Sequence, residues 1–150
     1  MLFTPTGPYE PGNQFTRNGG GISGYPDDGT PYLQAGSGDS LAFSYADGSL
    51  FGLTSVDLAG YSDAVPHFTV EFVGYLFNGG TVSTTFSGSE ITFQTFYFDS
   101  RFTGLTRVEL PNEPWSLDKL VVSVPEPQVW QLTALATGLA AAGAFGKRRR

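Results

Sequence analysis

The sequence contains no cysteine, one histidine and few cations, and each of these scarcities removes a class of function. Without cysteine there is no disulfide framework, no thiolate metal site and no cysteine nucleophile, and a zinc site is not expected with one histidine. His67 follows Pro66 and no Gly-x-Ser-x-Gly motif accompanies it, so we interpret it as a surface or edge residue. We therefore expect no enzyme, and we assign no catalytic and no cofactor-binding residue.

Basic residues are scarce over residues 1–124. This stretch holds thirteen Asp and Glu against four Arg and Lys, a net charge of −9, whereas the complete chain carries −6. An acidic surface argues against nucleic acid and anionic polysaccharide as direct ionic partners. It is compatible with divalent cations and neutral sugars.

Glycine and aromatic residues are abundant, whereas long heptads and Lys/Glu-rich helical stretches are missing. This profile is typical of an all-β domain with many turns. Short alternating segments, separated by turn signals such as Asp47-Gly48 and Asn78-Gly79-Gly80, predict about eight strands. We predict a two-sheet antiparallel sandwich of jelly-roll type over residues 31–124, with residues 1–30 as a loop-rich segment that packs on it.

Two segments carry the most informative strand patterns. Residues 67–77 form the clearest strand, because Phe68, Val70 and Phe72 alternate with polar residues. Over residues 115–124 the apolar side chains change parity at Asp118-Lys119. This change predicts either a β-bulge or a strand that is covered on both faces.

Residues 124–150 contain three parts in a fixed order. A short stiff spacer comes first, an apolar stretch runs from Val129 to Gly146, and a basic cluster follows. The spacer is Val124, Pro125, Glu126 and Pro127, and the cluster is Lys147, Arg148, Arg149 and Arg150. Eighteen helical residues extend for about 27 Å, close to the ~30 Å hydrocarbon core of a bilayer. The basic cluster would stay on the cytoplasmic side, which leaves everything before Pro125 outside.

This order of parts resembles the PEP-CTERM sorting tail of Gram-negative bacteria. The resemblance implies recognition by exosortase, a membrane protease-transferase, and cleavage at or near Pro125-Glu126-Pro127. The tail would then hold the protein in the inner membrane transiently, before release to the cell surface or the exopolysaccharide matrix. An ordinary single-pass C-terminal anchor is the alternative interpretation.

The stretch 1–8 has no basic region, no apolar region and no small-residue cleavage site, which is inconsistent with an export-dependent tail. We therefore expect that translation starts upstream or that the sequence is truncated, so that an N-terminal signal peptide is missing from it. If Met1 is the true start, the product would be a stranded fragment.

Residues 40–124 loosely resemble the common ectodomain of the same family, most clearly at the closing segment 115–120. Similar jelly rolls often hold a structural calcium ion between an acidic residue near the N-terminus and the Asp of the closing strand. The matching positions here are Glu10 and Asp118, which predicts a calcium site. Alternatively, Asp118 points to solvent or pairs with Lys119 or Arg107.

The leading functional hypothesis is an exported, non-enzymatic surface or matrix protein with a structural or adhesive role. An alternative is a carbohydrate-binding module for exopolysaccharide, and a matrix-polymer hydrolase is a third. The aromatic candidates for sugar stacking are Tyr9, Tyr25, Tyr32, Tyr61 and Trp115. The carboxylates available to a hydrolase are Glu10, Glu71, Glu90, Glu109 and Glu113. Asp27-Asp28-Gly29 lacks the spacing of a calcium loop, so we expect a plain turn there.

Overall fold

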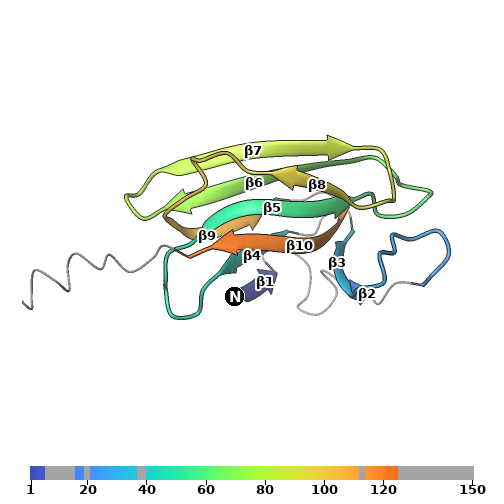
Figure 1. Ribbon diagram of the computed structural model, residues 1–150, viewed down its shortest axis with the longest axis horizontal. Coiled ribbons are helices and arrows are strands. Elements are labelled where there is room, and N and C mark those ends of the chain that lie inside the picture. The colour runs from blue at the N-terminus through green and yellow to red at the C-terminus, as the bar shows by residue number, and fades with distance from the viewer. Residues whose placement is uncertain (6–15, 19–20, 37–39, 112–113, 125–150) are drawn as a thin grey trace, which may run out of the picture.

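The computed structural model describes residues 1–5, 16–18, 21–36, 40–111 and 114–124, which form two antiparallel sheets and no helix (Figure 1). The predicted all-β fold with two antiparallel sheets is thereby confirmed. Sheet A has the strand order β1 (Leu2–Pro5), β4 (Leu41–Ser44), β9 (Leu105–Leu110), β6 (Phe68–Leu76) and β7 (Thr81–Gly88). Sheet B has the order β2 (Thr16–Asn18), β3 (Tyr32–Ala35), β10 (Trp115–Ser123), β5 (Gly52–Ala59) and β8 (Gln94–Tyr97).

Consecutive strands alternate between the two sheets at all but two places. β2 and β3 both lie in sheet B, and β6 and β7 form a hairpin within sheet A. Each crossover carries the chain from one layer of the sandwich to the other. Residues 1–30, which we predicted to be a loop-rich segment, contribute β1 to the edge of sheet A and β2 to the edge of sheet B.

In β6 buried and exposed side chains alternate, as its sequence predicts. Phe68, Val70 and Phe72 are buried between the sheets, whereas Thr69 and Glu71 are exposed on the outer face of sheet A. Burying every second side chain satisfies the apolar face of the strand and leaves the polar face to water.

Aromatic rings from four segments fill the space between the sheets. Phe72 lies 5.1 Å from Phe98, and Phe98 lies 4.9 Å from Phe102, measured between ring centroids. Phe86 packs against both Phe72 and Phe98. These contacts account for the dense aromatic content, because rings of this size bury large apolar areas.

The two ends of the sandwich differ in what they carry. At one end Ser123 of β10 pairs with Gly52 of β5, and the amide of Phe77 donates to the carbonyl of Gly104 at 3.0 Å. This is the end at which the chain leaves β10, and it is termed the exit end (Figure 1). At the opposite end the 60–67 loop joins the 21–30 loop through the Asp63 amide and the Gly24 carbonyl, 2.8 Å apart.

Candidate functional site

A β-bulge in β10 creates the most polar feature of sheet B. The register between β10 and β5 shifts between Asp118 and Val121, and Lys119 adopts a φ of 44°. The parity change at Asp118-Lys119 thus marks a bulge, one of the two structures that the sequence predicts. The bulge directs Asp118 and Lys119 to the outer face of the sheet, while Leu117 remains in the core.

Two carboxylates pair with the Lys119 ammonium on this outer face, and a third, Asp118, lies close by. Lys119 Nζ lies 2.5 Å from Asp28 Oδ2 and 3.6 Å from Asp57 Oδ2. The side chains of Asp28 and Asp57 are 17% and 13% exposed, although Asp28 belongs to a loop that is itself exposed. Asp118 is placed beside Asp57 by the pairing of β10 with β5.

Two threonine hydroxyls complete this arrangement, termed the Lys119 network (Asp28, Thr30, Asp57, Thr95, Asp118 and Lys119). Thr30 Oγ1 lies 2.7 Å from both Asp28 Oδ1 and Asp118 Oδ2, which links the 26–31 loop to β10. Thr95 of β8 donates to Asp57 Oδ1 at 2.5 Å. The network therefore connects one loop and three strands of sheet B.

The ion pair shifts the pKa of both partners toward their charged forms. The hydrogen bond from Lys119, followed by that from Thr30, lowers the pKa of Asp28 well below its usual range. The hydrogen bond to Asp28 in turn raises the pKa of Lys119. Both groups are therefore ionised at neutral pH, and the network carries more negative than positive charge.

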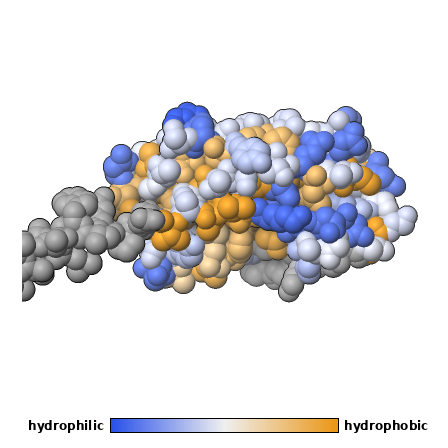
Figure 2. Space-filling model, in the orientation of Figure 1, coloured by the Kyte–Doolittle hydropathy of each residue, from blue (hydrophilic) through white to orange (hydrophobic). Residues whose placement is uncertain are grey.

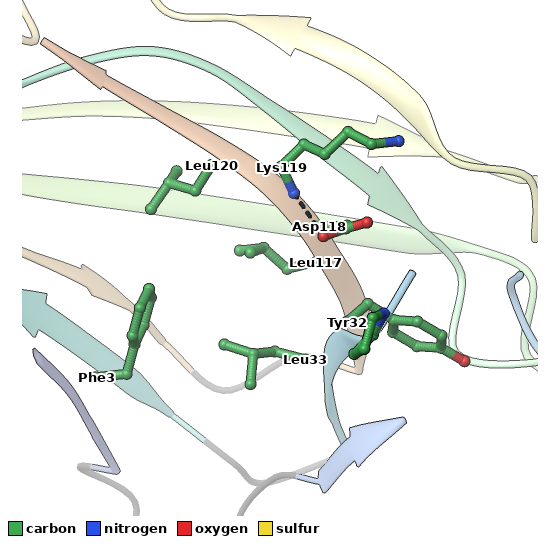
Figure 3. Close-up of a pocket in the computed structure, with 8 residues that line it drawn as sticks. Phe3, Tyr32, Leu33, Leu117, Asp118, Lys119 and Leu120 are labelled. Atoms are coloured by element: carbon green, nitrogen blue, oxygen red, sulfur yellow. Dashed lines mark hydrogen bonds between the residues drawn. The ribbon is translucent and has the colours of Figure 1, made fainter. Parts of the chain in front are cut away.

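A groove of about 500 Å³ lies beside the bulge. Its apolar wall comes from Phe3 of β1 and from Leu33, Leu117 and Leu120 of sheet B, as Figure 3 shows. β3 pairs with β10 only over Trp115–Leu117, so the groove opens where that pairing stops. With Asp118 on its rim, the groove combines an apolar wall with a hydrogen-bonding edge, a combination that suits a small amphiphilic ligand.

The predicted calcium pair cannot be assembled from the described residues, because Glu10 lies outside them. Asp118 is half-buried and accepts hydrogen bonds from Thr30 Oγ1 and from the Lys119 amide. Within residues 1–5, 16–18, 21–36, 40–111 and 114–124, no group of three or more His, Asp or Glu is arranged to hold a metal ion. Calcium at Glu10 and Asp118 stays a prediction.

The aromatic residues considered for sugar stacking separate into different environments. Tyr25 and Tyr61 lie together at the end opposite the exit end, with ring centroids 6.0 Å apart, and both are half-buried. Tyr32 is buried against Phe93, and Trp115, the first residue of β10, lies fully inside the core, so neither ring is available to stack on a sugar. Tyr9 lies outside the described residues. Two of the five candidates are thus brought together where a ligand could reach them.

The Tyr32 hydroxyl is buried and has no hydrogen-bond partner within the described part of the chain. Burial, together with the nearby charge of Asp27, raises the pKa of Tyr32. The neutral phenol is therefore the form present at physiological pH.

The candidates for hydrolytic chemistry occupy separate places. His67 is exposed before β6, and Glu71 is exposed on the outer face of sheet A. Glu109 pairs with Arg107 and accepts a hydrogen bond from Tyr75 Oη at 2.5 Å. Arg107 also stacks over the Tyr75 ring, with its Cζ 5.1 Å from the ring centroid, so the three side chains of this cluster contact one another. Glu90 is exposed, while Glu10 and Glu113 lie outside the described residues.

Sequence reasoning missed the role of Asp28. Asp27-Asp28-Gly29 does form a turn, in which Asp27 accepts the Gly29 amide at 2.9 Å. Asp28, however, also bonds Lys119, which lies 91 residues further along the chain. The scarcity of cations could have indicated such a pairing. Before the tail there are thirteen acidic residues and only four basic ones, so each basic residue has several possible acidic partners.

No family model matches the chain, and no curated protein and no solved structure matches it either. The fold and the site therefore define the class of the described part as a two-sheet antiparallel β-sandwich. No helix of the described residues is long and apolar enough to cross a membrane. The spacer after Val124, the apolar stretch 129–146 and the basic cluster all lie outside the described residues.

Proposed function

We propose that the protein is an exported, non-enzymatic β-sandwich of jelly-roll type that a PEP-CTERM-like tail delivers to the cell surface or the extracellular matrix. Its role there is structural or adhesive. The jelly-roll assignment is supported by the strand orders β4-β9-β6-β7 and β3-β10-β5-β8, in which successive strands switch sheets. The sorting assignment is supported by the order of spacer, apolar stretch and basic cluster over residues 124–150.

The position of the spacer relative to the fold carries this proposal. β10, the central strand of sheet B, ends at Ser123, and Pro125 follows after one residue. Cleavage at Pro125-Glu126-Pro127 would therefore leave every described strand intact. A sorting tail has to be joined to its cargo in this way, because removal must not unfold what is delivered.

The internal pairing of the charged groups supports a non-enzymatic role. Lys119 is held by Asp28 and Asp57, and Glu109 is held by Arg107 and Tyr75. Groups that neutralise one another stabilise the sandwich, whereas acid–base catalysis requires a group that faces a substrate. Exosortase is the proposed processing partner, and exopolysaccharide is the polymer that would surround the released domain.

The sorting proposal is tested by following the C-terminus of the chain in a Gram-negative host. The complete chain, preceded by a secretion signal, is produced in a strain that contains exosortase and in the same strain without it. We expect a product that ends near Pro125-Glu126-Pro127 at the surface of the first strain, and an intact chain in the inner membrane of the second. Mass spectrometry of the purified products reads the outcome. An intact Arg150 terminus in both strains would contradict the proposal.

A further inference from the structure

The exit end of the sandwich exposes apolar side chains that do not pack in the core. Phe77, at the tip of the β6–β7 hairpin, is 75% exposed, and Val124, the last described residue, is 60% exposed. Leu2 pairs with Ser44 at the same end of sheet A and is also exposed. Figure 2 shows an apolar stretch over the end of β10, followed by a hydrophilic region further along the same face.

Independent contacts place Phe77 and the end of β10 at one end of the sandwich. Ser123 pairs with Gly52, and Leu53 donates to the carbonyl of Phe102 at 2.9 Å. Phe77 is tied to the same loop through its amide, which donates to Gly104. The end of β10 and the tip of the β6–β7 hairpin thus share the 99–104 loop as a neighbour.

The sequence that follows Val124 indicates which partner the exit end would contact. The apolar stretch begins at Val129, five residues after Val124, and five extended residues span at most about 18 Å. If that stretch enters a bilayer, the exit end is held next to the lipid surface. Tethering at this distance makes contact between the sandwich and the bilayer intramolecular, so that a few apolar side chains suffice for it.

We infer that the exit end of the sandwich docks on the bilayer surface, with Phe77 inserted at the level of the lipid headgroups, and with Leu2 of β1 and Val124 after β10 also facing the lipid from other strands of the same end. This inference rests on the proposed function, because the tail has to be in the membrane first. Aromatic side chains are favoured at that depth, where an apolar body meets a polar boundary. The domain then stands with its strands pointing toward the lipid, and the Lys119 network lies at the side of the domain, on the outer face of sheet B.

The charges at the exit end define the kind of lipid surface. Arg101 and Asp99 neutralise one another across 2.7 Å, whereas Asp47 is exposed without a cation among its hydrogen-bond partners. Residues 1–124 as a whole carry a net charge of −9. Docking is therefore driven by apolar contact, and it is strongest on zwitterionic lipid and weaker on anionic lipid.

The two tryptophans of the chain allow a fluorescence test that measures the membrane contact of the tail and that of the sandwich separately. Trp130 lies in the apolar stretch, whereas Trp115 is fully buried in the core. The complete chain is reconstituted into phosphatidylcholine vesicles that contain brominated lipid, which quenches tryptophan at membrane depth. Phe77→Trp is then measured in a Trp130→Phe background, in which Trp115 supplies a constant signal that also reports folding.

We expect blue-shifted emission that is quenched by the brominated lipid from the Phe77→Trp reporter, and from a Leu2→Trp reporter at the same end. Ile22→Trp is the matched control, since Ile22 is 55% exposed but lies in the loop that joins Asp63 at the opposite end. Its emission should match that of a solvent-exposed tryptophan. Because β5 alone separates the two ends by roughly 26 Å, quenching cannot reach both.

The outcomes separate the inference from the function on which it rests. Quenched Trp130 in the wild-type chain together with unquenched reporters at positions 77 and 2 would overturn the docking and leave the sorting proposal standing. Unquenched Trp130 would overturn membrane insertion of the tail, and the docking would fall with it. Equal quenching of the Phe77→Trp and Ile22→Trp reporters would also overturn the proposed orientation.

Discussion

At the scale of single residues, the pairing of Asp28 with Lys119 illustrates how a chain with few cations uses one of them. Lys119 reaches two carboxylates on different elements, Asp28 in a loop and Asp57 on β5. Its own side chain is 53% exposed, so water screens part of the attraction. The pairing therefore fixes the position of the 26–31 loop more than it adds to the free energy of unfolding.

The pKa of Asp28 leads to a prediction about acid stability. Because this pKa is lowered on folding, the ion pair stabilises the protein above the unfolded value of about 3.9 and is lost as pH falls through the folded value. We expect Asp28→Asn to lower the free energy of unfolding at pH 7 by about 1 kcal/mol. The difference from wild type should shrink below about pH 4.

Urea unfolding of both proteins between pH 7 and pH 3 measures this effect. Glu71→Gln is a matched control, since Glu71 is an exposed carboxylate on the outer face of sheet A opposite Thr85. Its substitution should change stability by less than about 0.5 kcal/mol. A destabilisation by Asp28→Asn that stays constant down to pH 3 would show that the charge of Asp28 is not the cause.

At the scale of elements, the bulge in β10 does more than interrupt a ladder. It lets Trp115 and Leu117 pack into the core, and it lets Leu120 and Val122 do so as well, although the parity of the two pairs differs. The cost is the left-handed backbone of Lys119, a conformation that non-glycine residues rarely adopt. One residue thus carries both the backbone strain of the bulge and the charge of the network.

The two roles of Lys119 can be separated by substitution. Lys119→Ala removes the ion pair and keeps the strain, whereas Lys119→Gly removes both. We expect Lys119→Gly to be more stable than Lys119→Ala by about 1 kcal/mol in urea unfolding. Equal stability of the two variants would mean that the backbone at position 119 is not strained by its side chain.

At the scale of the whole molecule, the folded domain and the apolar tail are consecutive rather than interleaved. All described strands end by Ser123, and the buried core cluster is drawn from residues 35–117. We therefore expect the domain to fold without its tail, as the proposed release by cleavage would require.

A chain that ends at Val124 tests this independence. We expect its melting temperature to lie within about 2 °C of that of the complete chain, both measured by near-ultraviolet circular dichroism in the same mild detergent. The buried Trp115 supplies the signal. A broad transition, or a midpoint lowered by 10 °C or more (about 2 kcal/mol or more for a domain of this size), would mean that the tail contributes to the core.

The local features of this protein follow from short stretches of its amino-acid sequence. The alternation of Phe68, Val70 and Phe72 specifies an amphipathic strand, and a change of parity at Asp118-Lys119 specifies a bulge or a doubly covered strand, because both follow from the period of two of an extended chain. The order of parts over residues 124–150 is likewise readable without a fold. For the candidate site, the sequence identified Asp118 as unusual but did not identify its partners.

Which distant residues meet depends on the tertiary structure. Trp115, a candidate for sugar stacking, is in the core, because its place depends on β10 being the central strand of sheet B. Asp28 contacts Lys119 across 91 residues because the 26–31 loop leads into β3, which pairs with β10 beside the bulge. Such contacts follow from the order of strands in a sheet, and local periodicity contains no information about that order.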